Sequence, residues 1–475
     1  MNGGLARQRD RTEMQKPSSV IRGMLGAALE HHRAGRLTEA GQIYRQILAV
    51  DARQSDSLHL LGMIEHQAGH HDAAVEMIRR AITIHEKGAS YHSNLGTVLQ
   101  AQGKLEEALA SYERALALRP DLAEVHTNRG NILRTLGKLD EAMASHERGL
   151  SLSPGLTEAR YNLGLAQLHR GYYASGWGNF ESRWQSRDFG TPMRVYPQPL
   201  WAGETLVAGR LLIWGEQGVG DEVMFAGLIP EVVRAGNRCL LDCDSRLKSL
   251  FARSFPGVDV ITKDDRIQSD PSHSREEEIL AHLPSGSLPK LFRATSAAFA
   301  ATTSPYLTAD KVQRDRFRAR YADPDGRRLV GLAWHTKNPS TGRYRSVDLS
   351  LLAPLFARPD IRWVSLQYGD HDELERQAAA AGAPIFIDRS VDQFADIDIF
   401  AAQLAAMDMV VTIDNSTAHL AGALGIPTFV LLPSACDWRW LEAREDSPWY
   451  PTVSLIRQTR PGDWQSVVQR LRSAM

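Results

Sequence analysis

The stretch MDMVVTIDNSTAHLAGALGIPTFVLL, residues 407–432, decides the fold of the C-terminal part of this chain. Its first residues are apolar and β-branched, which is typical of a strand buried on both faces, and Asp414 ends that strand. The residues NST (415–417) are helix N-cap types, so AHLAGALG is expected to form a short helix that ends at Gly425. Pro427 then begins a second buried strand, TFVLL. The stretch therefore predicts a strand–helix–strand unit of a parallel sheet.

The N-terminus of the predicted helix is the first candidate binding site. It carries free backbone N–H groups and the positive end of the helix dipole, so it suits a phosphate or diphosphate. Asp414, Asn415, Ser416 and Thr417 border this end, and His419 in the first turn could donate to the same anion. The alternatives are a well-capped structural unit without a ligand and a histidine that is simply packed in the core.

Internal repeats with a period of 34 residues mark the N-terminal part of the chain. The best copy runs from Asn94 to Pro120 and matches the tetratricopeptide pattern. Three registers show this period: Gly35, Gly69, Gly103, Gly137 and Gly171; Gly62, Gly96, Gly130 and Gly164; and Ala40, Ala74, Ala108 and Ala142.

The best copy also predicts how each repeat folds. We expect Gly96 and Ala108 where the paired helices cross, since larger side chains would push the helices apart. Gly103 should serve the turn between them, and Pro120 should end the second helix. Each pair buries its apolar face only by stacking on its neighbours, and the last copy, around Gly171, looks like a capping repeat.

Composition excludes several classes of protein. The formal net charge is −1, from 55 Lys and Arg against 56 Asp and Glu, which argues against a nucleic-acid binder. Three cysteines without a CxxC pair indicate a reducing compartment and no metal site. No apolar run approaches the ~20 residues that span a bilayer. The first 20 residues lack an apolar signal region, so we expect a disordered tail and a cytoplasmic protein.

A second α/β pattern lies between the repeats and the opening stretch. Strands alternate with helical segments, which implies parallel sheets. We expect two Rossmann-like halves that face each other across a cleft, with ligands outside the carboxyl ends of the strands. A helix is expected over 221–236, with Pro230 inside it. The expected strands are RLLIW (210–214), CLLDC (239–243), VDVI (258–261), VGLAW (330–334), WVSLQ (363–367), PIFI (384–387), MVVTI (409–413) and TFVLL (428–432).

These patterns give a plan of the whole chain. Residues 1–20 form the tail, and 21–187 form about five repeats. Residues 188–325 form the first half, on the acceptor side, and 326–475 form the second half, on the nucleotide-sugar side.

The first half contributes a glycine loop to the expected cleft. Gln217, Gly218 and Gly220 follow a strand, and Asp221 lies in the first turn of the next helix. The helix dipole keeps such a carboxylate ionised, so Asp221 could accept a proton from a substrate hydroxyl. The alternative is that Asp221 only caps the helix.

The second half contributes a polar loop, WHTKNPSTGRYRS (334–346), after its first strand. Lys337 and two arginines, Arg343 and Arg345, give this loop its charge, and a cation here could neutralise a departing diphosphate. A solvated basic loop is the alternative. Further on, residues 437–451 concentrate four aromatic side chains, which favours an interface core over stacking on a nucleotide base.

The sequence VVTIDNSTAHLAGALG resembles the signature of the bacterial heptosyltransferase-like glycosyltransferases, which have a GT-B fold. The motifs WGEQGVGDEVMFA and DWRWLEAREDSPWYP are similar to those of relatives that fuse tetratricopeptide repeats to this domain. The architecture also resembles bacterial flagellin glycosyltransferases and O-GlcNAc transferase. Glu216-Gln217-Gly218 depart from the arginine-serine loop that heptosyltransferases usually carry.

The resemblance implies roles for particular residues. Asp221 matches the general base, and Lys337 and Arg345 fall in the donor phosphate loop. The positions expected to bind substrate are Gln217, Gly218, Gly220, Trp334, Asn338, Arg345, Asp414, Asn415, Ser416, Thr417 and His419, while Asp221 and Lys337 are the expected catalytic residues.

We therefore expect a metal-independent, inverting glycosyltransferase. It would use no cofactor other than the nucleotide-sugar co-substrate, and its acceptor would be a hydroxyl of a protein held by the repeats. Two alternatives remain. One is an interaction scaffold with a degenerate catalytic domain, since repeat arrays are mostly docking surfaces. The other is a sugar-nucleotide epimerase, which shares the two-half fold.

Overall fold

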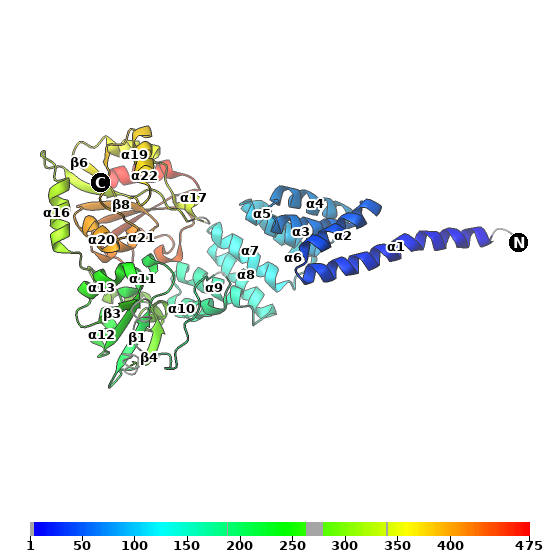
Figure 1. Cartoon of the computed structure of the whole chain (residues 1–475), viewed down its shortest axis with the longest axis horizontal. Coiled ribbons are helices and arrows are strands. Elements are labelled where there is room, and N and C mark those ends of the chain that lie inside the picture. Colours follow the sequence, from blue (N-terminus) through cyan, green and yellow to red (C-terminus); the bar gives the residue numbers. More distant parts are fainter. Residues whose placement is uncertain (1–3, 188, 263–278, 339–340) are drawn as a thin grey trace. The chain divides into compact units, whose positions relative to one another are not determined.

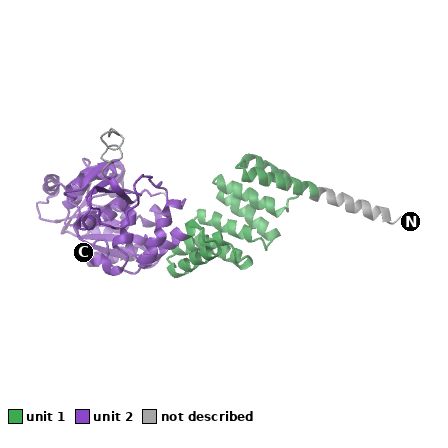
Figure 2. Cartoon of the chain, turned by 90° about the horizontal axis from the view of Figure 1, so that it is seen from below, with its two compact units in different colours: residues 1–159 green, residues 160–475 purple. Residues whose placement is uncertain are grey.

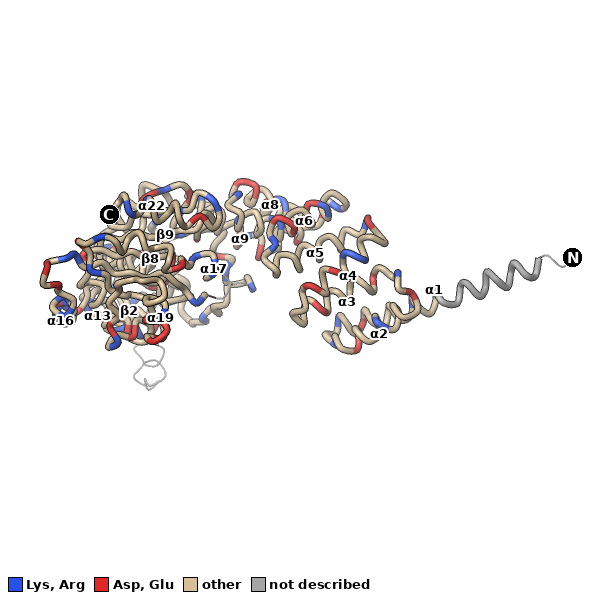
Figure 3. The backbone as a smooth tube through the Cα atoms, turned by 90° about the horizontal axis from the view of Figure 1, so that it is seen from above, with Lys and Arg blue, Asp and Glu red and all other residues tan. Residues whose placement is uncertain are grey.

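The computed structural model describes residues 4–187, 189–262, 279–338 and 341–475, with side chains from residue 19 onward. The chain divides into two compact units, residues 1–159 and 160–475 (Figures 1 and 2). Acidic and basic residues are interspersed along both units, in keeping with the near-zero net charge (Figure 3). No helix in the described ranges is both long enough and apolar enough to cross a membrane.

The first unit consists of antiparallel helix pairs, as the 34-residue period predicts. The turn glycines of the four pairs in this unit, Gly35, Gly69, Gly103 and Gly137, all have a positive φ of 73–86°, a conformation that costs glycine little. The helices are α1 (Gly4–Arg33), α2 (Leu37–Val50), α3 (Ser55–Gln67), α4 (His71–Ile84), α5 (Ala89–Ala101), α6 (Leu105–Leu118), α7 (Ala123–Thr135) and α8 (Leu139–Leu152).

The second glycine register lies where paired helices cross, as expected. A Cβ atom at Gly96 of α5 would lie 2.7 Å from the ring of Tyr112 on α6. At Gly130 the same atom would lie 2.6 Å from the ring of His146. Ala108 is fully buried. Small residues at these positions therefore let the two helices of a pair approach each other with one ring packed between them.

Helix α1 begins at Gly4 and so includes most of the segment that the sequence predicts to be a disordered tail, residues 1–20. Residues 1–3 lie outside the described part of the chain, as do the side chains before residue 19. The tail stays a prediction.

The fifth helix pair, α9 (Thr157–Arg170) and α10 (Tyr173–Phe180), belongs mostly to the second unit, which begins at Arg160. The repeat pattern itself was expected to extend to residue 187. The boundary between the two compact units lies before residue 187, because aromatic side chains of α10 pack into the α/β core. The Trp177 ring lies 5.4 Å from that of Trp438.

The second unit contains two separate parallel sheets, as the alternation of strands and helices predicts. The first has the order β3-β2-β1-β4. Its strands are β1 (Arg210–Trp214), β2 (Cys239–Cys243), β3 (Asp259–Thr262) and β4 (Ile279–Pro284). Strand β4 was not predicted, because ILAHLP mixes polar and apolar residues and follows a segment without a clear pattern.

The second sheet has the order β7-β6-β5-β8-β9-β10. The strand order reverses between β5 and β8, and in the first sheet it reverses between β1 and β4. Such points are where open parallel sheets bind ligands. The strands are β5 (Arg328–Leu332), β6 (Ile361–Ser365), β7 (Ile385–Phe386), β8 (Met409–Ile413), β9 (Thr428–Leu432) and β10 (Val453–Arg457), of which only β10 was missed.

The helix expected over 221–236 is in fact two helices, α11 (Val219–Ala226) and α12 (Ile229–Arg234). Pro230 lies in the first turn of α12, where its missing N–H needs no partner. The remaining α-helices of the unit are α13 (Lys248–Ser254), α15 (Leu288–Phe292), α16 (Lys311–Tyr321), α17 (Gly342–Arg345), α18 (Ala353–Phe356), α19 (His371–Ala380), α20 (Ile397–Ala405), α21 (Ser416–Ala423) and α22 (Trp464–Ala474).

The aromatic cluster of residues 437–451 lies in the largest core of the unit, as the interface interpretation predicts. Trp438 packs against α10, and Trp449 lies 5.0 Å from the ring of Phe299. The four rings are buried, so they do not offer a surface for stacking a base. They are Trp438, Trp440, Trp449 and Tyr450.

We expect Gly96→Val to destabilise the repeats, because the new side chain overlaps the Tyr112 ring. Overpacking of this kind costs about 1–3 kcal/mol or more. The control is Gly155→Val, since a Cβ atom there meets nothing within 4 Å. Thermal unfolding followed by far-UV circular dichroism measures both. Equal melting temperatures for the two variants would show that the helix crossing does not depend on this glycine.

Candidate functional site

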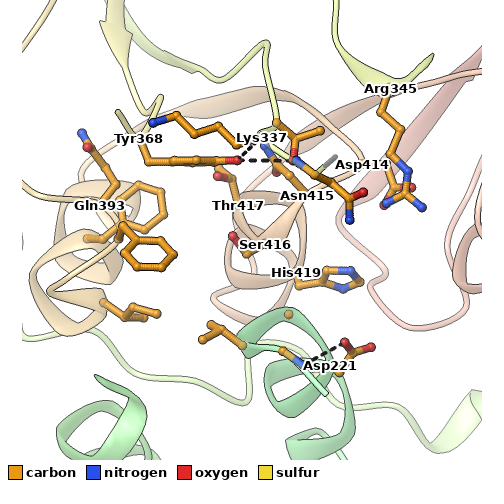
Figure 4. Close-up of a pocket in the computed structure, with 18 of the residues that line it drawn as sticks. Asp221, Lys337, Arg345, Tyr368, Gln393, Asp414, Asn415, Ser416, Thr417 and His419 are labelled. Atoms are coloured by element: carbon orange, nitrogen blue, oxygen red, sulfur yellow. Dashed lines mark hydrogen bonds and ion pairs between the residues drawn. The ribbon is translucent and has the colours of Figure 1, made fainter. Parts of the chain in front are cut away.

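A cavity of about 740 Å³ lies at the carboxyl ends of strands of both sheets (Figure 4). Its walls bring together residues that the sequence places far apart. Figure 4 shows Lys337 and Arg345 on one side and Asp221 on the other, with Ser416 and His419 between them. Of the predicted site residues, the cavity is lined by Gly218, Gly220, Asp221, Lys337, Asn338, Arg345, Asp414, Asn415, Ser416, Thr417 and His419.

The segment after β8 builds the centre of the cavity. Asn415 is the N-cap of α21, and its side-chain oxygen accepts from the backbone N–H of Ala418 at 3.3 Å. Thr412 Oγ1 donates to the same oxygen at 3.0 Å. The N–H groups of Ser416 and Thr417 open the helix and have no partner within it. The N-terminus of α21 is thus a wall of the cavity, as predicted.

Lys337 lies on a loop that is tied to the end of β6. The backbone N–H of Lys337 donates to Tyr368 Oη at 2.8 Å, and the N–H groups of Trp334 and His335 both donate to Gln367 Oε1. The Lys337 side chain is exposed and makes no ion pair with any described residue. Its backbone is therefore held at the edge of the cavity, and no described carboxylate neutralises its charge.

A network of charges along the cavity joins the two halves. Arg439 forms ion pairs with Asp221 from the first half and with Asp437 from the second. Arg345 lies 3.1 Å from Asp414 and 3.6 Å from Asp437. Guanidinium and carboxylate groups thus alternate along this wall.

Burial and these ion pairs shift the pKa values of two carboxyls in opposite directions. Burial raises the pKa of Asp414, and the nearby charge of Asp437 adds to the shift while Arg345 opposes it. Burial also acts on Asp437, but Arg439 and Arg345 outweigh it and lower the pKa of that carboxyl. Asp437 is therefore an ionised carboxylate that lies between the two arginines.

Asp221 is the third residue of α11. Its Oδ2 accepts from the backbone N–H of Gly218 at 3.3 Å, which caps the helix, and its Oδ1 pairs with Arg439. Asp221 therefore caps the helix, as one interpretation predicts, and it also lines the cavity. Its role as a proton acceptor stays a prediction. The carboxylate is 18% exposed, so solvent and a ligand can reach it.

His419 is a buried, hydrogen-bonded residue that also reaches the cavity. Its Nδ1 lies 2.9 Å from Tyr450 Oη, and its ring stacks on Trp440. Burial, with the charge of Arg439, lowers the pKa of His419 to about 3. The ring is therefore neutral at physiological pH and does not supply a positive charge to a bound anion.

Two predicted residues do not line the cavity. Trp334 is buried beneath the Lys337 loop, where its Nε1 lies 3.4 Å from Gln377. Gln217 lies next to the cavity and accepts from Arg439 at 3.1 Å. Its backbone φ is 64°, the left-handed region that residues other than glycine rarely adopt. Both residues position neighbours of the cavity.

An apolar wall completes the cavity and was missed by the sequence analysis. Phe394 is 64% exposed, its ring lies 6.4 Å from that of Tyr368, and the Arg246 guanidinium covers it at 4.7 Å. The lining residues that were not predicted are Val219, Arg246, Thr336, Tyr368, Gly369, Asp392, Gln393, Phe394, Ile397, Phe400, Asp437 and Arg439.

A signal existed for some of the missed residues. Asp437 and Arg439 belong to the DWRW segment, in which a role was predicted only for the tryptophans. Tyr368 follows the predicted strand WVSLQ at its carboxyl end, where ligands are expected. Phe394 and Gln393 lie in a polar segment after β7, and no sequence pattern singles them out. In the described part of the chain, no group of three or more metal-ligand side chains is placed to hold a metal ion.

Comparison with known proteins identifies the repeats. Residues 55–88 and 88–155 match family models of the tetratricopeptide repeat. Protein FlbA of Caulobacter vibrioides is 31% identical to this chain over 319 residues. The match covers 65% of this chain and 53% of FlbA, so the chain spans about half the length of that curated relative.

Three solved structures each match about a third of the chain. A crystal structure of MamA matches with 22% identity and a TM-score of 0.31, over 33% of this chain and 91% of that one. MamA from Desulfovibrio magneticus RS-1 matches with 16% identity and a TM-score of 0.32, over 34% and 91%. YrrB, described as a tetratricopeptide protein with an unusual peptide-binding site, matches with 20% identity and a TM-score of 0.31, over 35% and 86%.

Glu222, the neighbour of Asp221, ties α11 to the end of β2. Its Oε2 accepts from the backbone N–H of Asp244 at 2.9 Å. The carboxyl also lies against Gly215, where a Cβ atom would come within 2.4 Å of it. Burial raises the pKa of Glu222 to about 8. The folded chain therefore keeps this proton at pH 7, whereas the unfolded chain releases it above about pH 4.5.

We expect Glu222→Gln to be more stable than the unsubstituted chain at pH 9 and of similar stability at pH 5. Folding raises the pKa of Glu222, so this residue lowers the free energy of unfolding as the pH rises from about 4.5 to about 8. An amide keeps the bond from Asp244 and does not titrate, so the gain should reach a few kcal/mol. Urea denaturation at both pH values measures it, and a gain that does not change with pH would contradict the buried, protonated Glu222.

Proposed function

We propose that this chain is a glycosyltransferase of the GT-B type that moves a sugar from a nucleotide-sugar to an acceptor hydroxyl. One observation carries the proposal: a single cavity brings together a helix N-terminus, a lysine without an ion pair among the described residues, and an aspartate from the other half. The strand order of each sheet reverses beside this cavity, and this position supports the same proposal. The similarity to FlbA is compatible with it but covers only part of either chain.

The donor would occupy the second half of the cavity. Its diphosphate would accept from the N–H groups of Ser416 and Thr417 at the start of α21, which the helix dipole favours. Lys337, which has no carboxylate partner among the described residues, would neutralise part of that charge. The base would lie against the wall of Tyr368 and Phe394, the apolar part of the cavity.

The chemistry follows from the charge that develops during transfer. As the glycosidic bond breaks, the sugar becomes oxocarbenium-like and the nucleotide leaves as a diphosphate anion. Lys337 and the α21 N–H groups would stabilise this anion, which is the role that a metal ion serves in other transferases. We therefore propose that the reaction uses neither metal nor cofactor.

Asp221 would accept the proton of the acceptor hydroxyl. It reaches the cavity from α11, on the side opposite Lys337 and Arg345 (Figure 4). The Gly218 N–H and Arg439 orient its two oxygens. A base on the face of the sugar opposite the leaving group favours inversion at the anomeric carbon. This geometry is what a direct displacement by the acceptor needs.

The acceptor would be a protein recruited by the repeats. Stacked helix pairs form extended surfaces that commonly bind proteins, and the first unit is built of such pairs. Docking on the repeats would raise the local concentration of an acceptor side chain such as Ser or Thr.

A scaffold with an inactive α/β unit is the second candidate. The observation that favours it is the Arg439 ion pair, which occupies one oxygen of Asp221. In that case the repeats would act alone, and the cavity would bind no nucleotide.

The test is the melting temperature of the chain with UDP-, GDP-, ADP- and CMP-sugars and with the free nucleotides. We expect one nucleotide class to raise it, because a ligand that binds only the folded state stabilises that state. Lys337→Ala should remove most of the shift, and Lys311→Ala, an exposed lysine on α16 outside the cavity, should keep it.

Three results would count against the proposal. The absence of a shift with every nucleotide favours the scaffold. A shift that Lys337→Ala leaves intact places the nucleotide elsewhere. Conversion of the free donor to its epimer without an acceptor indicates an epimerase.

A further inference from the structure

The glycine loop of the first half is held by a buried arginine from the end of the repeats. Arg183 lies on the 3₁₀ turn Glu181–Gln185, directly after α10, and its side chain is fully buried. Its Nε and Nη2 donate to the two oxygens of Glu216 at 3.0 and 2.9 Å. This is a bidentate pair, the strongest geometry for such groups.

The other donors of Arg183 are also used. Nη2 donates to Ser287 Oγ at 2.8 Å, and Nη1 donates to Glu181 Oε1 at 2.8 Å. The guanidinium lies 4.6 Å from the ring of Phe180 and 4.3 Å from that of Trp184. A guanidinium with this many partners has a single orientation, so it can fix the position of the Glu216 carboxylate.

Glu216 is equally constrained. It is 2% exposed, and it lies between the ends of β1 and β4. A Cβ atom at Gly286 would come within 2.1 Å of its Oε1, so the carboxylate fills the space that this glycine leaves. Glu216 is also the residue at which the sequence departs from the arginine-serine loop of heptosyltransferases.

Glu216 fixes the start of the loop that leads to Asp221. The next residue, Gln217, has the left-handed backbone conformation, and Gly218 after it caps α11. A strained residue persists only when its neighbours hold it in place. Arg183 fixes Glu216, the residue before Gln217. Arg439 Nη2 donates to Gln217 Oε1 at 3.1 Å and so fixes the Gln217 side chain.

Stability alone does not require such a pair. Buried ion pairs can often be replaced by apolar side chains without loss of stability, whereas removal of one partner leaves an uncompensated charge. We propose that Arg183 is a positioning residue: it fixes Glu216 and thereby sets the direction in which the loop delivers Asp221 to the cavity. The end of the repeats is thus a structural part of the candidate active site.

The experiment measures amide hydrogen exchange over residues 215–222 in the full chain, and separately the melting temperature. The variants are Arg183→Met, Glu216→Met and the double variant of the two. The single variants should melt lower, since each leaves a buried charge. The double variant should regain the melting temperature, yet residues 215–222 should exchange at least tenfold faster than in the unsubstituted chain.

A matched control comes from a second buried pair of the same half. Arg293 donates to Glu231 through both Nη atoms and is 1% exposed, but it does not contact the glycine loop. The double variant Arg293→Met/Glu231→Met should leave exchange over residues 215–222 unchanged.

A double Arg183/Glu216 variant with normal melting and normal exchange over residues 215–222 would overturn the proposal. If that variant does not fold, Arg183→Lys decides, because lysine keeps the charge but cannot make both bonds. Faster exchange in folded Arg183→Lys supports positioning, and unchanged exchange refutes it.

The functional consequence rests on the proposed transfer and is tested separately. With the donor that stabilises the chain, the double variant should keep its KM and lose at least tenfold in kcat, because only the acceptor side is displaced. If no nucleotide binds at all, the proposed function fails, while the exchange measurement still decides the role of Arg183.

Discussion

The candidate site depends on the ion pairs of Arg439. This guanidinium binds Asp221 of the first half and Asp437 of the second, and Asp437 in turn faces Arg345. A partly buried charge without a partner is costly, so each member of this network constrains the others. The network thus links residues of the two halves across the cavity that both halves line.

Much of the fold follows from elementary patterns in the sequence. The 34-residue period predicts the helix pairs, because a small residue is needed wherever two helices cross, as at Gly96 against Tyr112. The buried apolar runs predict eight of the ten strands in the described part of the chain. In the two missed strands polar residues interrupt the apolar run, His282 in β4 and Ser454 and Arg457 in β10.

The site was predictable where chemistry and position coincide in a short motif. The helix cap at Asn415 and the loop with Lys337 follow strands and carry residue types with an evident use. Phe394 could not be found in this way, because its place in the cavity depends on Arg246 from the other half. The pairing of Arg183 with Glu216 was also missed, because the two lie 33 positions apart in the sequence and only the fold brings them together.

The central claim is that the cavity transfers a sugar with Asp221 as the base. The most direct measurement is the release of nucleoside diphosphate from the stabilising donor, with and without acceptor protein, by the unsubstituted chain and by Asp221→Asn. The account predicts release that increases with the acceptor and falls by about 10²-fold or more in Asp221→Asn, with donor binding retained. Equal release by both chains would contradict it.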